Sequence, residues 1–389
     1  MSQIDANAEP KVVPRIYSAD KITLEEVVPL ETPFSVHIDV CSVCNFKCSF
    51  CFQADYDGMK EVGLVRGLMK MDLFKKTVDE LKHFPEKIKK IKIGNHGEPT
   101  MHKLLPKFIE YIRASDVTEI VEVFTNGSKL EPTLNRALVD SGLQRINISL
   151  EGLTSERYKE VADVKMDMEE LQANIKDLYD YKNSVNSDLN IYIKVVDNAG
   201  SYDTEDDTIF TFSQEERDHF FDTYGPICDE IFIESIVPQW SQTQEDKQNI
   251  DVVNDEEEVQ RLGMYDQKIK NYKEICPFTF MYLHINYDGT VSPCTLDWAK
   301  KVVIGDINHQ TPQEVWKGEK LAQLQLAQLE GKRHKIDFCN DCSAPMVCCD
   351  EYLDPHAEEI RKKMFPNIER NSPNQWTRKI DIPVQMITD

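Results

Sequence analysis

The sequence predicts an α/β protein whose main part is an open, partial (β/α)6 TIM-like barrel. Six β-rich segments recur before residue 240, at 34–40, 89–94, 118–124, 145–150, 189–196 and 231–237. Helical stretches separate nearly all of them, which is the pattern of βα units and a parallel sheet. A closed TIM barrel has eight such units, so six predict an incomplete one. Ligand-binding groups are then expected at the carboxyl ends of the strands.

The connecting segments also have recognisable patterns. Residues 71–84 form a helix candidate before the second strand, and residues 125–128 (Thr-Asn-Gly-Ser) end the third strand with a turn. A helix is expected from Thr154, after the fourth strand. Ser213 and Glu216 have the spacing of a capping box, which predicts a helix before the sixth strand.

The net charge of the chain makes some classes of binding partner unfavourable. The 389 residues include 45 Lys and Arg against 68 Asp and Glu, a formal net charge of −23. Nucleic acids and anionic membrane surfaces are poor partners, because both are bound through Lys and Arg. Apolar runs fall short of the ~20 residues of a membrane span, and residues 1–15 lack the apolar stretch of a secretory signal. We therefore expect a soluble, cytoplasmic protein.

Eleven cysteines carry most of the functional information, and ten of them are clustered. The clusters are Cys41, Cys44, Cys48 and Cys51; Cys276 and Cys294; and Cys339, Cys342, Cys348 and Cys349. Cys228 stands alone and is expected to be a buried structural thiol. In a large cytosolic protein, such clustering indicates metal or redox chemistry rather than disulfides.

The first cluster has the spacing C-x3-C-x2-C over Cys44, Cys48 and Cys51, directly after the first strand. Three thiolates at this spacing can hold one [4Fe–4S] cluster and leave one iron open to a small molecule. A zinc site remains the alternative, with Cys41 as the fourth ligand that zinc prefers.

With Phe50 before its last cysteine, this loop resembles the signature of the radical S-adenosylmethionine (SAM) enzymes. The resemblance covers about residues 34–350. It implies that the open iron binds the amino and carboxylate groups of SAM. The reduced cluster then cleaves SAM to a 5′-deoxyadenosyl radical, which removes a hydrogen atom from a substrate. An external electron donor of the flavodoxin or ferredoxin type is implied as a partner.

Motifs after the next three strands resemble other segments of the family. The residues to which the resemblance gives a cofactor-binding role are Phe50, Gly97, Glu98, Thr125, Asn126, Ser149 and Glu151. Gly97-Glu98-Pro99 is similar to the end of the family's Gly-Gly-Glu-Pro, where backbone carbonyls and the Glu accept hydrogen bonds from the methionine ammonium group. Asn95-His96 depart from that motif. Glu151 replaces the Asp of a ribose-binding Ser-x-Asp-Gly.

Three further residues are candidates for catalytic work. Lys194 in the fifth strand and Glu234 in the sixth could point into the barrel, although charges on strands more often face solvent. Cys349 could supply a hydrogen atom to a substrate radical. For Cys348 and Cys349, a structural role and ligation of an incomplete cluster also remain open.

The C-terminal cysteines belong to a β-hairpin followed by a helical stretch, 312–329. Asp288-Gly289 marks the hairpin turn, between strands at 282–286 and from Val291. The arrangement resembles the SPASM and twitch auxiliary domains of radical SAM enzymes, in a truncated form. The resemblance implies one auxiliary [4Fe–4S] cluster, on Cys276, Cys294, Cys339 and Cys342. A zinc ribbon on the same four ligands is the alternative.

Five regions follow from these patterns: an N-terminal extension (1–33), the barrel (34–240), an acidic linker with a solvated helix (241–275), the auxiliary-cluster domain (276–350) and a polar tail (351–389).

The predicted function is hydrogen abstraction from a carbohydrate-like or aminocyclitol small molecule, leading to dehydrogenation, epimerisation or dehydration. A fully ligated auxiliary cluster suits dehydrogenation, because it can accept an electron. The alternative is a maturase acting on a peptide or protein, although the 43 residues before Cys44 look too few for a leader-recognition domain. A second alternative is a non-catalytic zinc or iron–sulfur scaffold.

Overall fold

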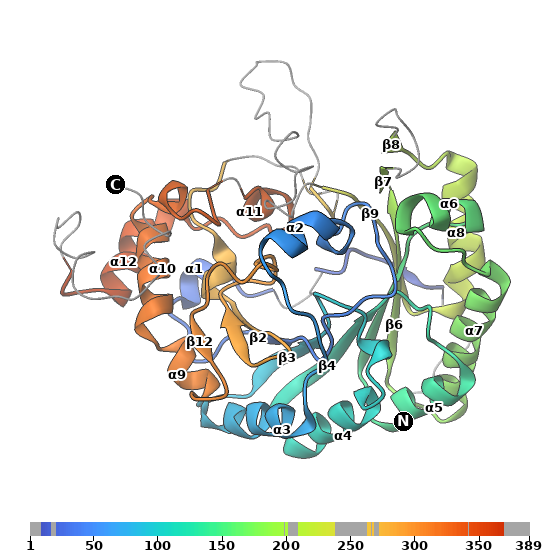
Figure 1. The fold of residues 1–389 in the computed structure, drawn as a ribbon, viewed down its shortest axis with the longest axis horizontal. Coiled ribbons are helices and arrows are strands. Elements are labelled where there is room, and N and C mark those ends of the chain that lie inside the picture. The colour runs from blue at the N-terminus through green and yellow to red at the C-terminus, as the bar shows by residue number, and fades with distance from the viewer. Residues whose placement is uncertain are drawn as a thin grey trace.

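The computed structural model describes residues 9–16, 21–197, 199–200, 209–237, 263–265, 267, 272–340 and 342–368. Its centre is a sheet with the strand order β1-β9-β6-β5-β4-β3-β2-β10-β11-β12 (Figure 1). Six neighbouring parallel strands form the partial barrel: β2 (Ser35–Ile38), β3 (Ile88–Ile93), β4 (Thr118–Thr125), β5 (Arg145–Leu150), β6 (Asn190–Asp197) and β9 (Glu230–Ser235). The prediction of six βα units is confirmed.

Helices cover the outer face of the sheet (Figure 1). They are α3 (Met71–Glu80), α4 (Leu105–Ser115), α5 (Pro132–Asp140), α6 (Ser155–Ala162), α7 (Met168–Ser184) and α8 (Gln214–Tyr224). Thr154 caps α6 by accepting from the Arg157 backbone N–H, and Ser213 and Glu216 form the predicted capping box at α8. Shorter elements are α1 (Leu24–Val27), α2 (Tyr56–Glu61), β7 (Ala199–Gly200) and β8 (Ile209–Phe210).

The sheet extends beyond the six predicted strands at both edges. At one edge β1 (Lys11–Val12), from the N-terminal extension, pairs parallel to β9. At the other edge β10 (Tyr282–Ile285), the first strand of the auxiliary domain, pairs parallel to β2. Its hairpin partner β11 (Thr290–Ser292) and then β12 (Gly305–Asp306) complete the sheet. The auxiliary hairpin is therefore a continuation of the barrel sheet, which the division at residue 276 did not predict.

The C-terminal helices differ from the predicted ones in two respects. The single helical stretch 312–329 is two helices, α9 (Pro312–Trp316) and α10 (Glu319–Leu329), with Gly318 as the N-cap of the second. After α11 (Ala344–Val347), the tail forms α12 (Ala357–Met364), whose Ile360 is buried in one cluster with Leu24 and Leu329. Most of the predicted acidic linker (241–275), like the tail after residue 368, lies outside the described residues.

Alternate residues of the barrel strands face two different environments. Val121, Ile146 and Ile191 are fully buried in one apolar cluster with residues of the covering helices. On the opposite face, toward the barrel interior, Glu122 forms ion pairs with Lys90 and Arg145, at 3.3 and 3.2 Å. The outer core therefore supplies the apolar burial that folding requires, while the interior is lined by charged and polar groups.

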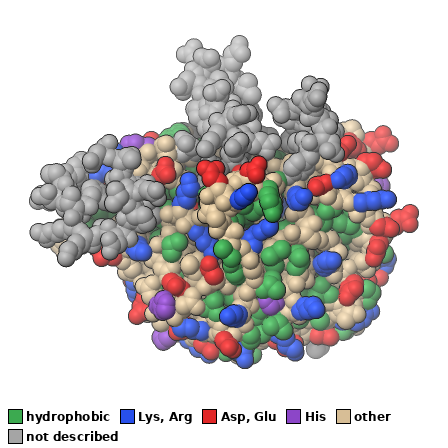
Figure 2. All heavy atoms as spheres, viewed as in Figure 1, with side chains coloured by type: hydrophobic (Ala, Val, Ile, Leu, Met, Phe, Trp, Pro, Cys, Tyr) green, Lys and Arg blue, Asp and Glu red, His purple; other side chains and the backbone are tan. Residues whose placement is uncertain are grey.

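The surface carries mixed charges. On the face shown in Figure 2, basic and acidic side chains are interspersed, and acidic ones gather along the right-hand margin. Within the described part of the chain, no helix has the length and apolar character needed to cross a membrane.

Candidate active site

The first cysteine loop follows β2 at the carboxyl end of the barrel. Cys44, Cys48 and Cys51 are half-buried and interact electrostatically with one another. Burial raises the pKa of Cys44 and of Cys51 to about 12, so both thiols are protonated in the absence of a metal. Iron binding would displace these protons, as metal binding to thiols generally does. The three residues fit the ligand set of an iron–sulfur cluster.

Cys41 is separated from this group. It is fully buried, its thiol donates to the Val43 carbonyl at 3.1 Å, and its electrostatic neighbours are Glu98 and Asp39. This position argues against Cys41 as the fourth ligand of a zinc site. It favours a cluster with three protein ligands and one open iron.

The loop after β3 lies directly against the cysteine loop. The Glu98 backbone N–H donates to the Val43 carbonyl at 2.9 Å. A Cβ atom at Gly97 would lie 2.5 Å from the Cys41 carbonyl oxygen and 2.7 Å from that of Val43. Real Cβ atoms do not come this close to backbone, so only glycine allows the two loops to meet.

Replacing Gly97 with alanine is therefore expected to push the two loops apart and to reduce cluster incorporation several-fold. Iron counting after anaerobic reconstitution measures the effect. Gly225→Ala is the matched control, because its Cβ would meet only two Pro10 ring carbons, at 3.2 and 3.8 Å. Equal iron contents in the two variants would contradict the close-approach argument.

The Glu98 carboxylate is surrounded by donors from its own loop and from the loop after β4. It is buried and accepts from the Thr100 N–H, the Thr100 and Thr125 hydroxyls, and the Asn126 N–H, at 2.5 to 2.9 Å. Four donors from the protein occupy both oxygens. The carboxylate therefore joins the loops after β3 and β4.

Thr125 and Asn126 extend this connection to the cysteine loop. The Asn126 side-chain amide donates to the Asn45 side chain at 3.1 Å and lies 4.0 Å from the Cys44 sulfur. The Thr-Asn-Gly segment thus supports the cluster ligands in addition to forming a turn.

Ser149 and Glu151 lie at the end of β5. Burial raises the pKa of Glu151 to about 7, an effect that the nearby Lys194 opposes. The Cys48 thiol hydrogen-bonds to the Glu151 carboxyl group. The buried Oε2 atom has no partner within the limits of hydrogen-bond geometry among the described residues. A buried acceptor of this kind needs a donor.

Lys194 and Glu234 are brought together inside the barrel. The Lys194 ammonium donates to the Glu234 carboxylate at 2.6 Å, and the Arg15 guanidinium lies 3.4 Å from the other oxygen. Burial raises the pKa of Glu234, but the two cations outweigh burial and keep the pKa below its usual value. Arg15 also donates to the Tyr265 hydroxyl at 2.6 Å. Sequence reasoning missed Arg15, because nothing in residues 1–33 indicates that this segment reaches the barrel.

The four auxiliary cysteines line one cavity, together with Arg333 and apolar side chains. All four are buried: Cys276, Cys294, Cys339 and Cys342. The Arg333 guanidinium donates to the Cys339 and Cys342 carbonyls at 3.0 and 2.8 Å and places a positive charge beside the thiols. Four converging thiols with a neighbouring cation fit an anionic four-thiolate metal centre.

The structure separates the two remaining cysteines. Cys349 interacts electrostatically with Lys273, Glu351 and Cys276, and burial raises its pKa to about 11. Cys348, by contrast, interacts electrostatically with Cys342, Arg15 and Glu234. Cys228 is buried in the main core, as expected for a structural thiol.

Family comparisons agree with this geometry. Residues 38–198 match the model of the radical SAM superfamily, and residues 276–343 match that of the SPASM iron–sulfur cluster-binding domain.

Two curated relatives show how far sequence similarity extends. A probable GTP 3′,8-cyclase from Metallosphaera sedula is 36% identical over 136 residues, which are 35% of this chain and 39% of that protein. A protein from Pyrococcus furiosus that modifies the cofactor of a tungsten-containing aldehyde ferredoxin oxidoreductase is 29% identical over 119 residues, 30% of this chain and 31% of that one. The match thus spans only 31–39% of the length of these relatives.

Among solved structures, Streptococcus suis SuiB bound to its precursor peptide SuiA aligns with a TM-score of 0.53 at 15% identity. The alignment covers 93% of this chain and 84% of SuiB. At this identity the likeness shows a common fold.

Proposed function

Because this chain belongs to the radical SAM superfamily and carries an auxiliary iron–sulfur domain, we propose that it removes a hydrogen atom from a polar, carbohydrate-like small molecule. The observation that carries the proposal is the convergence of Cys44, Cys48 and Cys51 without Cys41. When bound, a [4Fe–4S] cluster with one open iron supplies the electron that cleaves SAM to methionine and a 5′-deoxyadenosyl radical.

The residues that would surround SAM lie at successive strand ends. The backbone of the Gly97 loop would accept hydrogen bonds from the ammonium group, and Glu98 would hold that loop against Thr125 and Asn126. Glu151 Oε2 would accept a hydrogen bond from a ribose hydroxyl. Phe50 and Ser149 are the other residues to which the family resemblance gives a role in SAM binding.

The barrel interior supports a polar substrate. Glu234 is a buried carboxylate between Lys194 and Arg15, and it can orient a substrate hydroxyl or accept its proton. Oxidation of a CH–OH carbon to a ketone removes one hydrogen atom, one proton and one electron. The four-thiolate site at Cys276, Cys294, Cys339 and Cys342 would hold the acceptor of that electron. A flavodoxin- or ferredoxin-type donor would supply the electron for SAM cleavage.

Anaerobic reconstitution tests this proposal. We expect roughly eight iron atoms per chain, as two [4Fe–4S] clusters require. After dithionite reduction, SAM should yield 5′-deoxyadenosine, and a panel of hexoses and aminocyclitols should contain a substrate that is oxidised to a ketone with one deoxyadenosine per turnover. If the protein binds zinc and leaves SAM intact, the assignment as a radical SAM enzyme is wrong. If the enzyme modifies a peptide and accepts no sugar, the proposed substrate class is wrong, while the proposed radical chemistry stands.

A further inference from the structure

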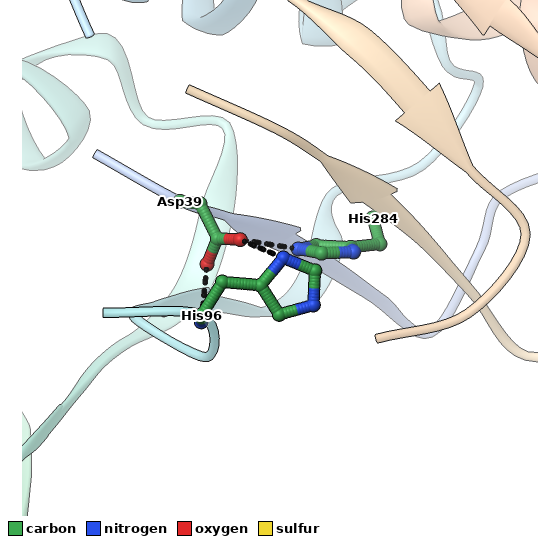
Figure 3. A group of neighbouring side chains, drawn as sticks. All are labelled: Asp39, His96 and His284. Atoms are coloured by element: carbon green, nitrogen blue, oxygen red, sulfur yellow. Dashed lines mark hydrogen bonds and ion pairs between the residues drawn. The ribbon is translucent and has the colours of Figure 1, made fainter. Parts of the chain in front are cut away.

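A buried cluster of Asp39, His96 and His284 joins segments that are far apart in the sequence (Figure 3). Asp39 directly follows β2, His96 lies in the loop after β3, and His284 lies on β10 of the auxiliary hairpin. Their exposed fractions are 0, 4 and 0%. Asp39 Oδ2 lies 3.0 Å from His96 Nδ1 and 2.8 Å from His284 Nε2. One carboxylate oxygen thus links the barrel to the auxiliary domain.

The hydrogen bonds around His96 determine its protonation. Its Nε2 atom lies 2.5 Å from the Thr295 carbonyl oxygen, which can only accept, and its Nδ1 atom faces the carboxylate. Both ring nitrogens therefore donate, and the ring is an imidazolium. Burial lowers the pKa of His96, but the Asp39 carboxylate and the Thr295 carbonyl outweigh burial and raise it.

His96 touches both of the loops that carry metal-site cysteines. Its carbonyl accepts from the Gln53 side-chain amide, two residues after Cys51. Its ring bonds to Thr295, the residue after Cys294. In sequence, His96 immediately precedes Gly97. A displacement of His96 would therefore move the proposed SAM loop relative to the auxiliary hairpin.

We propose that Asp39, His96 and His284 are positioning residues that fix the position of the SAM-binding loop relative to the auxiliary-cluster hairpin. The proposal rests on the proposed function in one respect, the assignment of the Gly97 loop to SAM. Its consequence is that SAM affinity depends on a side chain of the auxiliary domain, His284. Without the His284 N–H, the Asp39 carboxylate accepts fewer hydrogen bonds. A buried carboxylate needs its full set of hydrogen bonds, so Asp39 would then keep His96 in place less firmly.

The test uses reconstituted full-length enzyme with SAM as the probe, measured by anaerobic equilibrium dialysis alongside iron counting. His284→Leu is expected to weaken SAM binding about tenfold. Iron counted in the same samples separates this effect from a loss of cluster. His284→Gln should restore most of the affinity, since its amide N–H can donate to Asp39. His102→Leu is the matched control: His102 is also buried, but it bonds to Met69 and Leu104 within the barrel domain.

Three results would overturn the proposal. One is wild-type SAM affinity in His284→Leu. Another is equal loss in the leucine and glutamine variants, which would indicate general packing. The third is a metal ion beyond the two clusters that disappears in His284→Leu, since the three side chains are of types that bind metals and their ligand atoms lie within 4.8 Å of one another. If wild-type protein neither binds nor cleaves SAM, the proposed function fails before any variant is compared.

Discussion

Replacing Cys48 with alanine is expected to abolish reductive cleavage of SAM and to remove about half of the bound iron. Cys48 interacts with both Cys44 and Cys51 and is central to the three-thiolate group. A cube held by two cysteines would be poorly retained, and SAM would lose the iron to which it binds. The auxiliary site has its own four cysteines in a separate cavity, so it should keep its iron. Deoxyadenosine formation and iron per chain are the two measurements.

Cys41→Ala is the matched control, three residues before Cys44 in the same loop. Cys41 bonds to the Val43 carbonyl and lies apart from the other three, so its loss should leave cleavage and iron close to wild type. Loss of metal in Cys41→Ala equal to that in Cys48→Ala would instead support a four-thiolate zinc site.

Replacing Glu234 with glutamine is expected to destabilise the protein by about 3–5 kcal/mol, the usual cost of removing one partner from a buried ion pair. Glu234 is 1% exposed and faces two cations, Arg15 and Lys194. The amide would remove the negative charge that Arg15 and Lys194 share, and among the described carboxylates only Glu151 would remain near Lys194. At one fixed heating rate, the thermal midpoint of the reconstituted protein should fall by on the order of 10 °C.

Glu110→Gln provides the comparison on the surface. Glu110 pairs with Lys107 across one helical turn, and both side chains are exposed. Such pairs contribute at most about 1 kcal/mol, so the midpoint should change little. Similar midpoints for the two variants would mean that the barrel interior is solvated and that Glu234 is not held as a buried ion pair.

The local part of the site could be predicted from the sequence. Cys44, Cys48 and Cys51 lie within eight consecutive residues, so their spacing alone keeps the thiols together. The predicted strands agree with the observed ones to within a few residues, because β-rich segments and helix caps are local patterns. The sequence left open whether Lys194 and Glu234 face the barrel interior or solvent, and the structure pairs them inside the barrel.

Contacts between distant segments could not be predicted in this way. His284 meets Asp39 across 245 residues, and Arg15 meets Glu234 because β1 pairs with β9. Both depend on which strands become neighbours at the sheet edges, and no local pattern in the sequence specifies that pairing. The different surroundings of Cys348 and Cys349 have the same origin: they are adjacent in the chain, and only the packing around them gives Cys348 the electrostatic neighbours Arg15 and Glu234.

The sequence by itself thus determined the barrel strands and the three-cysteine loop, because both depend on local patterns. The radical chemistry and the auxiliary cysteine set, which spans residues 276–342, were implied by the family resemblance. The tertiary structure alone decided how the two cysteine sites are joined. It showed the auxiliary hairpin as part of the barrel sheet, Glu98 as a link between loops, and one carboxylate holding histidines from both domains. Those features arise from buried polar groups, which must find partners wherever the fold places them.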